Sequence, residues 1–134
     1  MRNINKIVVH HTGTPQSTTV ESIRHYHTKV LGWKDIGYHY LIEAGGTLRL
    51  GRPDGIIGAH TKGLNRESIG IALIGNYMGR EPNPYALNKL SILLRDLYYQ
   101  FPYAKVVAHR EVAPTLCPGD KLHDWLCEWR IGDV

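Results

Sequence analysis

The chain has 134 residues, about the length of one typical domain, so we expect a single domain spanning residues 1–134. Its 43% hydrophobic and 21% charged residues exclude both intrinsic disorder and a small scaffold that depends on disulfides. No apolar run approaches the roughly 18 residues of a membrane span. Only three apolar residues follow the opening MRNINK, so we expect no signal peptide. We therefore expect synthesis in the cytoplasm and no membrane insertion.

The net charge of +4 is moderately basic and is compatible with binding to an anionic polymer. The chain lacks any long block of Lys or Arg and has a single Phe, so we expect no nucleic-acid partner. The two cysteines, Cys117 and Cys127, are expected to be reduced thiols, because disulfides are rare in the cytoplasm.

The first 32 residues predict a strand followed by a helix. The run KIVVH at 6–10 is apolar and β-branched, as in a buried strand, and it ends in a histidine. Thr18 and Glu21 have the spacing of a capping box and Gly32 would end the helix, so we predict a helix over about 18–31. Its stripe at helical spacing consists of Ile23, Tyr26, His27 and Val30.

The middle of the chain predicts a β-hairpin, a long loop and a buried strand. Side chains alternate in character over 38–43, and Gly45-Gly46 separates them from a second short strand, which is typical of a hairpin. Residues 51–68 predict a long surface loop, and the apolar run at 69–74 predicts a buried strand.

The last third predicts a helix, a strand and a final helix. Asn83-Pro84 is a favourable helix start, and we predict a helix over 84–101. Its apolar stripe consists of Leu87, Leu90, Leu94, Leu97 and Phe101. The run KVVAH at 105–109 repeats the pattern of the first strand, and Asp120 is expected to cap the last helix. The apolar residues of that helix are Leu122, Trp125, Leu126 and Trp129.

Strands and helices are interspersed along the chain. This order predicts an α/β fold with a single mixed β-sheet of about five to six strands and helices packed on its faces. Open sheets of this kind place ligands at the carboxyl ends of their strands.

Two of the predicted strands end in histidine, at His10 and His109. If these strands are parallel neighbours, their imidazoles meet at one edge of the sheet, and Cys117 lies in a loop that could fold back over the same edge. Two histidines and one cysteine form a three-ligand zinc site with an open fourth position, the catalytic type. Two alternatives stay open at this point. The three residues could be ordinary core or edge residues, or Cys117 could be a nucleophile with His109 as its base.

Four of the other histidines have structural interpretations, whereas His27 and His60 are less clear. His25 and His123 are expected to be exposed on helices, and His39 alternates within the predicted hairpin. His11 should point away from His10, because successive strand residues face opposite sides of a sheet.

Four ordered blocks carry a more specific signal: VVHHTGTP at 8–15, GWKDIGYHYLI at 32–42, GAHTKGLNRESIGIALIGNY at 58–77 and AHREVAPTLCPG at 108–119. Together they resemble the zinc-dependent N-acetylmuramoyl-L-alanine amidases, a family that includes phage amidase-type lysozymes and animal peptidoglycan recognition proteins. The resemblance covers nearly the whole chain and implies the fold and the chemistry of that family.

The resemblance implies zinc ligands at His10, His109 and Cys117. It places the family's catalytic tyrosine at Tyr38, whose phenol could donate to a developing oxyanion. The second catalytic position is Thr115, where similar phage members often carry lysine and amidase-active recognition proteins carry threonine. A hydroxyl stabilises an oxyanion only by hydrogen bonding, whereas an ammonium also contributes its charge.

The resemblance also implies contacts with the peptide stem of the substrate, from Thr12, His27, His60 and Asn65. Arg52 is followed by Pro53 and Asp54, which do not match the pair that recognition proteins use to distinguish diaminopimelate from lysine stems. The stem specificity therefore stays open.

The sequence thus predicts a zinc amidase that cleaves the bond between N-acetylmuramic acid and L-alanine in peptidoglycan. We expect a phage or prophage endolysin that is a monomer and acts at the bacterial cell wall after its release from the cytoplasm. A cytoplasmic amidase of cell-wall recycling fits the same facts. The alternative of a different class is a non-catalytic peptidoglycan-binding recognition module, although such members typically lack the cysteine ligand that is present here at Cys117.

Overall fold

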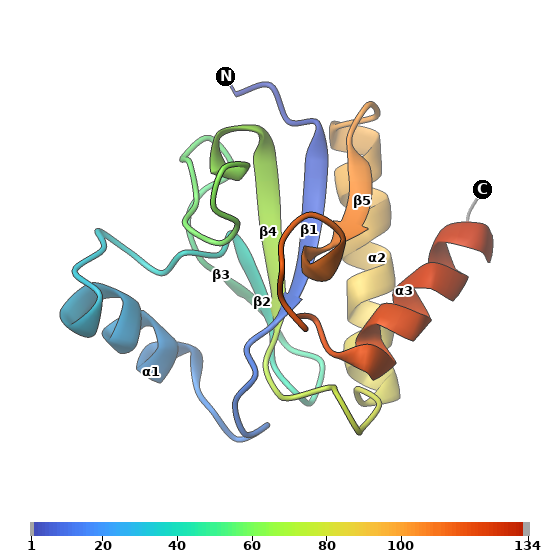
Figure 1. The fold of residues 1–134 in the computed structure, drawn as a ribbon, viewed down its shortest axis with the longest axis horizontal. Coiled ribbons are helices and arrows are strands. Elements are labelled where there is room, and N and C mark those ends of the chain that lie inside the picture. Colours follow the sequence, from blue (N-terminus) through green and yellow to red (C-terminus); the bar gives the residue numbers. More distant parts are fainter. Residues whose placement is uncertain (1, 133–134) are drawn as a thin grey trace.

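The computed structural model describes residues 2–132, in which helices flank one five-stranded sheet (Figure 1). The strands are β1 (Lys6–His11), β2 (Tyr40–Ile42), β3 (Leu48–Leu50), β4 (Ser68–Leu73) and β5 (Lys105–Ala108). They lie in the order β3-β2-β4-β1-β5, and only β2 and β3 pair in antiparallel fashion. The predicted α/β fold with a mixed sheet is confirmed.

Side chains of the central strands divide between the two faces of the sheet. Ile7 and Val9 of β1 lie in the larger apolar core, together with the odd-numbered residues of β4. Strand geometry sends the alternate residues, His10 among them, to the other face. The core and the candidate site therefore share the same strands but occupy opposite faces.

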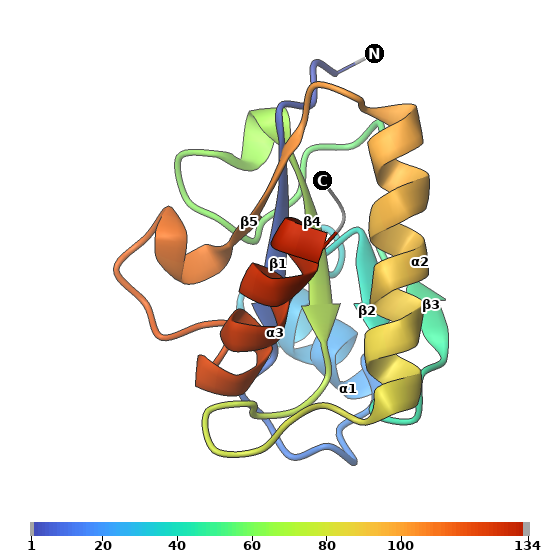
Figure 2. The same ribbon diagram turned by 90° about the vertical axis from the view of Figure 1, so that its right-hand side faces the viewer.

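Two helices cover the core face, α2 (Pro84–Gln100) and α3 (Asp120–Gly132), and Figure 2 shows them from their side. Helix α2 starts as its sequence predicts, because the Asn83 side chain accepts a hydrogen bond from the Tyr85 N–H at 2.8 Å and Pro84 begins the first turn. The buried residues of α2 are Ala86, Leu90, Leu93, Leu94 and Leu97. Most of the predicted stripe is thus confirmed as core, and α2 ends one residue earlier than predicted.

The start of α3 differs from the prediction. Asp120 is the first residue of the helix rather than its cap. The chain turns at Gly119, whose φ of +92° is accessible to glycine, and the Asp120 carboxylate pairs with Arg110 at 2.9 Å. Within residues 2–132, no helix has the length and apolar character needed to cross a membrane.

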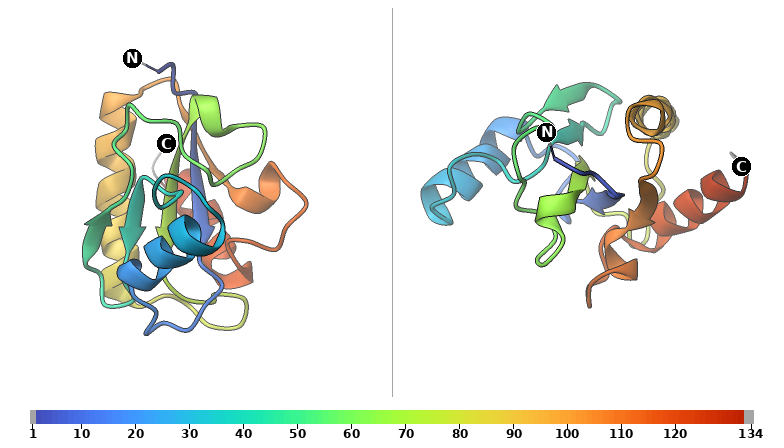
Figure 3. Two further views of the ribbon diagram at one scale, coloured as in Figure 1. Left: turned by 90° about the vertical axis from the view of Figure 1, so that its left-hand side faces the viewer. Right: turned by 90° about the horizontal axis from the view of Figure 1, so that it is seen from above.

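The first helix lies across the sheet from α2 and α3 (Figure 3). It consists of α1 (Val20–His25) and a π-helical turn, η1 (Tyr26–Val30). A second, smaller core holds it against the sheet. The buried members of that core are Val20, Ile23, Ile36, Leu41 and Ile74.

Two predictions for this helix were wrong. Its cap is Thr19, whose hydroxyl oxygen accepts a hydrogen bond from the Ser22 N–H at 3.0 Å, rather than Thr18. Tyr26 and Val30 were expected in the buried stripe, yet they are 52% and 64% exposed. The reason is the π-helical turn, whose wider winding breaks the 3.6-residue spacing on which the stripe was based.

Candidate active site

The carboxyl ends of two neighbouring strands bring His10 and His109 together, as the sequence predicts. Strands β1 and β5 are parallel, and both histidines lie one residue beyond the paired Val9 and Ala108. Their ring centroids are 4.4 Å apart. His109 opens a short 3-10 helix, η3 (His109–Glu111), so the chain leaves the sheet at this point.

The loop after η3 brings Cys117 back to the two histidines. The Arg110 N–H donates to the Cys117 carbonyl at 2.8 Å, which closes the loop on itself. The Cys117 Sγ lies 3.4 Å from the His11 backbone N and 3.7 Å from the His10 Nδ1. His10, His109 and Cys117 form what we call the donor group.

The donor group is suited to hold a metal ion. One ligand atom from each of its residues lies within 4.8 Å of the others. Within residues 2–132, the buried His109 Nδ1 is one of the few side-chain polar atoms without a hydrogen-bond partner. A buried nitrogen without a partner is costly unless something binds it. Two imidazoles and a thiol are a donor set that zinc favours.

The electrostatics of the donor group agree with metal binding rather than with a free nucleophile. Burial lowers the pKa of His10 well below its ordinary value and also lowers the pKa of His109, so both rings are neutral at neutral pH. Burial raises the pKa of the Cys117 thiol to about 11. A Cys–His nucleophile needs a lowered thiol pKa, whereas a bound cation would deprotonate the thiol directly. The alternative of a Cys–His peptidase is therefore disfavoured.

Tyr38 lies beside the donor group, just before β2, which begins at Tyr40. Its ring centroid is 5.3 Å from that of His10 and 5.8 Å from that of His27. Burial raises the pKa of the Tyr38 phenol, with a smaller contribution from Cys117. The phenol therefore keeps its proton at neutral pH and can donate a hydrogen bond.

A cleft of about 300 Å³ opens next to Tyr38, and we call it the hydroxyl cleft. Its lining residues are Thr12, Thr14, Thr18, Ser22, Ile23, Tyr26, His27 and Tyr38. Most of them carry a hydroxyl group, and none carries a carboxylate or an ammonium group. The cleft is therefore suited to an uncharged, hydrogen-bonding ligand segment.

The sequence-predicted site residues outside the donor group lie in three places. Thr12, His27 and Tyr38 line the hydroxyl cleft. A hydrogen bond fixes the orientation of the His27 imidazole, because its Nδ1 accepts from the Gly37 N–H at 2.9 Å. Thr115 lies in the loop of the donor group, where its hydroxyl oxygen accepts a hydrogen bond from the Cys117 N–H at 3.2 Å.

His60 and Asn65 are not among the residues that line the cleft. His60 lies behind His10, with its Nδ1 2.9 Å from the His10 Nε2. The Asn65 side-chain oxygen accepts hydrogen bonds from the backbone N–H groups of His60 and Thr61 at 2.9 and 2.8 Å, at the start of the turn η2 (Asn65–Glu67). Asn65 thus fixes the path of the loop that carries His60.

Sequence reasoning missed several residues around the site. Thr14, Thr18 and Ser22 line the cleft, and their only signal was that they are short polar residues between a strand end and a helix start. Ser68 and Gly70 of β4 contact His60. A glycine in the middle of a buried strand was a signal for them, because it marks a close approach by another group.

A second cluster of donor atoms lies on the other side of the same loop. Glu111 lies within reach of His123 and Cys127 of α3, and the ligand atoms of these three residues are within 4.8 Å of one another. Both Glu111 carboxylate oxygens are bonded to Arg130, at 2.7 and 2.8 Å, and His123 lies 3.1 Å from one of them. The prediction that His123 is exposed was wrong, because this helix face packs on the loop of the donor group. We interpret this cluster as a structural contact that holds the loop of the donor group against α3.

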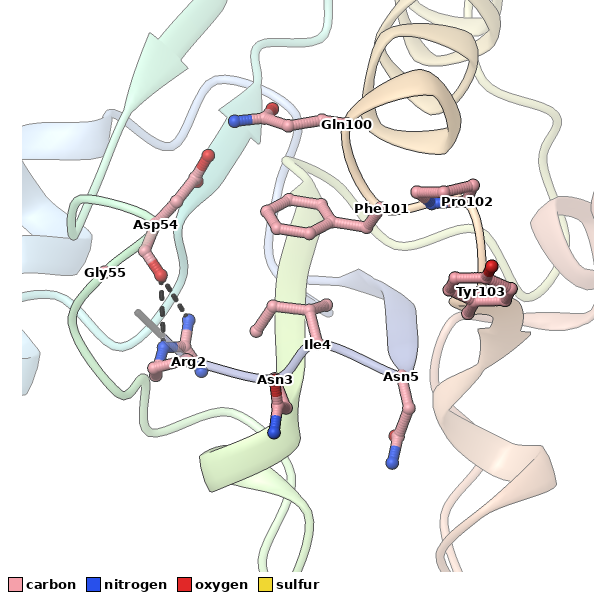
Figure 4. A pocket seen from close by; sticks show the side chains of 10 residues that line it. All are labelled: Arg2, Asn3, Ile4, Asn5, Asp54, Gly55, Gln100, Phe101, Pro102 and Tyr103. Atoms are coloured by element: carbon pink, nitrogen blue, oxygen red, sulfur yellow. Dashed lines mark hydrogen bonds between the residues drawn. The ribbon is translucent and has the colours of Figure 1, made fainter.

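A second hollow lies away from the donor group (Figure 4). It has a volume of about 770 Å³ and opens between the N-terminal segment and the turn that joins α2 to β5. Asp54 and Phe101 line it, and Arg2 donates hydrogen bonds to the Asp54 carbonyl there. This hollow is at the amino ends of β1 and β5, whereas the donor group is at their carboxyl ends.

Comparisons with known proteins agree with this geometry. The family described as N-acetylmuramoyl-L-alanine amidase matches residues 1–120. The endolysin of Klebsiella phage KP32 is 37% identical over 128 residues, which cover 90% of this chain and 84% of that protein. The endolysin of Escherichia phage T7 is 37% identical over 126 residues, which cover 89% of this chain and 83% of that protein.

The fold is also shared with a solved amidase. N-acetylmuramoyl-L-alanine amidase LysC from Clostridium intestinale superposes with a TM-score of 0.89 at 33% identity, covering 98% of this chain and 87% of that one. Because the family match extends over most of the sequence and the whole fold agrees, the chain belongs to the N-acetylmuramoyl-L-alanine amidase family.

Proposed function

We propose that this chain is a zinc amidase that hydrolyses the bond between N-acetylmuramic acid and L-alanine in peptidoglycan. The observation that carries the proposal is the convergence of His10, His109 and Cys117 beside the hydroxyl cleft, in a chain of the amidase family. Its similarity to phage endolysins supports a role in host-wall lysis, in which the enzyme acts at the wall as a monomer after leaving the cytoplasm.

His10, His109 and Cys117 would hold the zinc ion. When bound, zinc supplies a Lewis acid that polarises the scissile carbonyl and makes water a better nucleophile at neutral pH. The neutral state of the two imidazoles favours this binding, since protonated histidine cannot act as a ligand. The Cys117 thiol must lose its proton when the ion binds.

Tyr38 is the residue that we assign to the oxyanion. Its phenol is buried, protonated and adjacent to His10, so it can donate a hydrogen bond to the carbonyl oxygen as negative charge develops there. Thr115 uses its oxygen to accept a bond from the Cys117 N–H, which leaves its hydroxyl proton available to a substrate oxygen. Its other role is to order the loop that carries Cys117.

The hydroxyl cleft is the proposed binding place of the lactyl-peptide segment of the substrate. This segment consists of amides and a methyl-bearing linker, which match neutral hydroxyl groups and aromatic faces. Thr12 and His27 are the proposed stem contacts within the cleft. We also propose His60 and Asn65 as site residues, although their contacts are with the protein itself.

The experiment measures new L-alanine amino termini released from purified peptidoglycan. Release should stop after chelation, return when zinc is added, and be absent in Cys117→Ser. Cys127→Ser is the matched control, because Cys127 is a second partly buried thiol outside the donor group, and this variant should retain release. A protein that binds zinc and peptidoglycan yet releases no amino termini would instead be a recognition module.

A further inference from the structure

A chain of hydrogen bonds runs behind His10, away from the hydroxyl cleft. It begins at the Leu64 carbonyl, to which the Ser68 hydroxyl donates at 2.8 Å. The Ser68 oxygen lies 3.2 Å from the His60 Nε2. The His60 Nδ1 lies 2.9 Å from the His10 Nε2, so the chain ends at a residue of the donor group. We call these four residues the relay.

The direction of the relay follows from which atoms can donate. A carbonyl only accepts, so the Ser68 proton is used on Leu64 and its oxygen accepts from the His60 Nε2–H. A neutral imidazole carries one proton, so the His60 Nδ1 must accept from the His10 Nε2–H. The His10 Nδ1 is then without a proton, and it is the nitrogen that lies 3.7 Å from the Cys117 Sγ.

The opposite direction fits the distances less well. If the His60 Nδ1 carried the proton, the Ser68 hydroxyl would have to donate to the His60 Nε2, at 3.2 Å, and give up the shorter bond of 2.8 Å to Leu64. Both imidazoles would also need to be neutral in either direction. Within residues 2–132, neither ring forms a hydrogen bond with a carboxylate, so nothing there stabilises a buried imidazolium.

The ring of His60 is held from several sides. A Cβ on Gly70 would lie 2.5 Å from the His60 Cγ, so the ring rests directly on the backbone of β4. Asn65 fixes the His60 backbone N–H, and the Thr61 hydroxyl lies 3.0 Å from the His60 Nδ1. A residue this constrained and outside the cleft is suited to orient a neighbour rather than to contact substrate.

We infer that His60 is a positioning residue that acts through His10: the relay fixes the proton of His10 on Nε2 and presents the bare Nδ1 to the metal. The inference rests on the proposed function, because it assigns the zinc ligand atom of His10. It adds a residue, Ser68, that touches neither the donor group nor the cleft and yet sets the affinity for zinc.

The first test reads the tautomers in the full chain after metal removal. Long-range proton–nitrogen correlation spectra distinguish a protonated from an unprotonated ring nitrogen. The relay requires the proton on Nε2 of both His10 and His60. A proton on the Nδ1 of either ring would overturn it. This measurement does not depend on hydrolysis, so absence of amidase activity would refute the proposed function and leave the tautomer result standing.

The second test measures zinc affinity by chelator competition. His60→Leu should weaken binding by about 10- to 100-fold, the usual effect of losing the partner of a metal-bound histidine. His60→Asn should rescue most of this loss, because its amide oxygen lies near the position of Nδ1 and can accept from the His10 Nε2–H. Equal losses in the two variants would show that His60 only fills space.

Ser68→Ala gives the sharpest test, because it removes one oxygen without changing the shape of the core. It should weaken zinc binding in the native background and have no further effect in His60→Leu. The matched control is Ser91→Ala, which removes the acceptor of the Trp129 indole N–H at 3.0 Å and lies outside the relay. If Ser68→Ala leaves zinc affinity unchanged, or Ser91→Ala lowers it equally, the relay does not act on the metal.

Discussion

Replacing Gly70 by alanine tests how closely His60 is seated on the sheet. The new Cβ would lie 2.5, 2.6 and 2.7 Å from the Cγ, Cδ2 and Nδ1 of His60. Carbon atoms in contact prefer about 3.5 to 4.0 Å, so the ring must retreat by about 1 Å. The bond of 2.9 Å between His60 and His10 would then exceed hydrogen-bonding distance.

The expected cost has two parts. Overpacking a buried position costs about 1 to 3 kcal/mol. Losing a buried hydrogen bond adds about 1 kcal/mol, so Gly70→Ala should lower the free energy of unfolding by about 2 to 4 kcal/mol. The measurement is urea unfolding of the metal-free protein, followed by circular dichroism.

Gly79→Ala is the matched control for this substitution. A Cβ at Gly79 would meet nothing within 4 Å, and its φ is not positive, so alanine there should be neutral or slightly stabilising. Equal unfolding midpoints for Gly70→Ala and Gly79→Ala would refute the close packing of His60 on β4.

Three further predictions concern other parts of the molecule. Tyr38→Phe should reduce kcat on peptidoglycan by about 100-fold or more while zinc content stays unchanged, since it removes one oxyanion donor; near-native kcat would contradict the assigned role. Leu94→Ala should cost about 2 to 5 kcal/mol in urea unfolding because Leu94 is fully buried, whereas Ile92→Ala, at a position 47% exposed on the same helix, should cost less than about 1 kcal/mol. Glu111→Gln should lower stability by about 1 to 2 kcal/mol at pH 7, a value reduced for the partial exposure of the carboxyl. Hydrogen bonds from Arg130 lower the pKa of Glu111 from 4.5 to about 2, so this contribution is complete above pH 4.5 and disappears as the pH falls towards 2; a difference between native and variant that persists at pH 2 would contradict it.

The sequence predicted the donor group because two of its three residues directly follow predicted strands. His10 and His109 each close a short apolar run, and parallel neighbouring strands bring such ends together. The return of Cys117 to the site was also a local matter, since Cys117 comes only eight positions after His109. The resemblance to the amidases added Tyr38, which lies beside His10 in the fold.

The sequence could not predict what lies behind the donor group. His60 is fifty residues from His10 and lies in the long loop between β3 and β4, where no periodicity indicates which side chains turn inward. The exposure of Tyr26 was missed for a related reason, because a π-helical turn leaves no mark in the hydrophobic pattern. The periodic pattern of a regular helix or strand indicates which side chains are buried. In a loop or a π-helical turn, only the tertiary contacts determine this.

The contact between Glu111 and Arg130 allows the last helix to affect the donor group, although no residue of that helix belongs to it. The loop from His109 to Cys117 supplies two of the three residues of the donor group. The bonds of Glu111 to Arg130 and to the Ala108 N–H help to hold this loop, together with the ion pair between Arg110 and Asp120. A fusion or truncation that unwinds the final turn of α3 would break the bonds between Arg130 and Glu111 and loosen this loop, which should lower the affinity for the proposed zinc ion. Engineers who append a wall-targeting module should therefore place it beyond a spacer that leaves Arg130 helical.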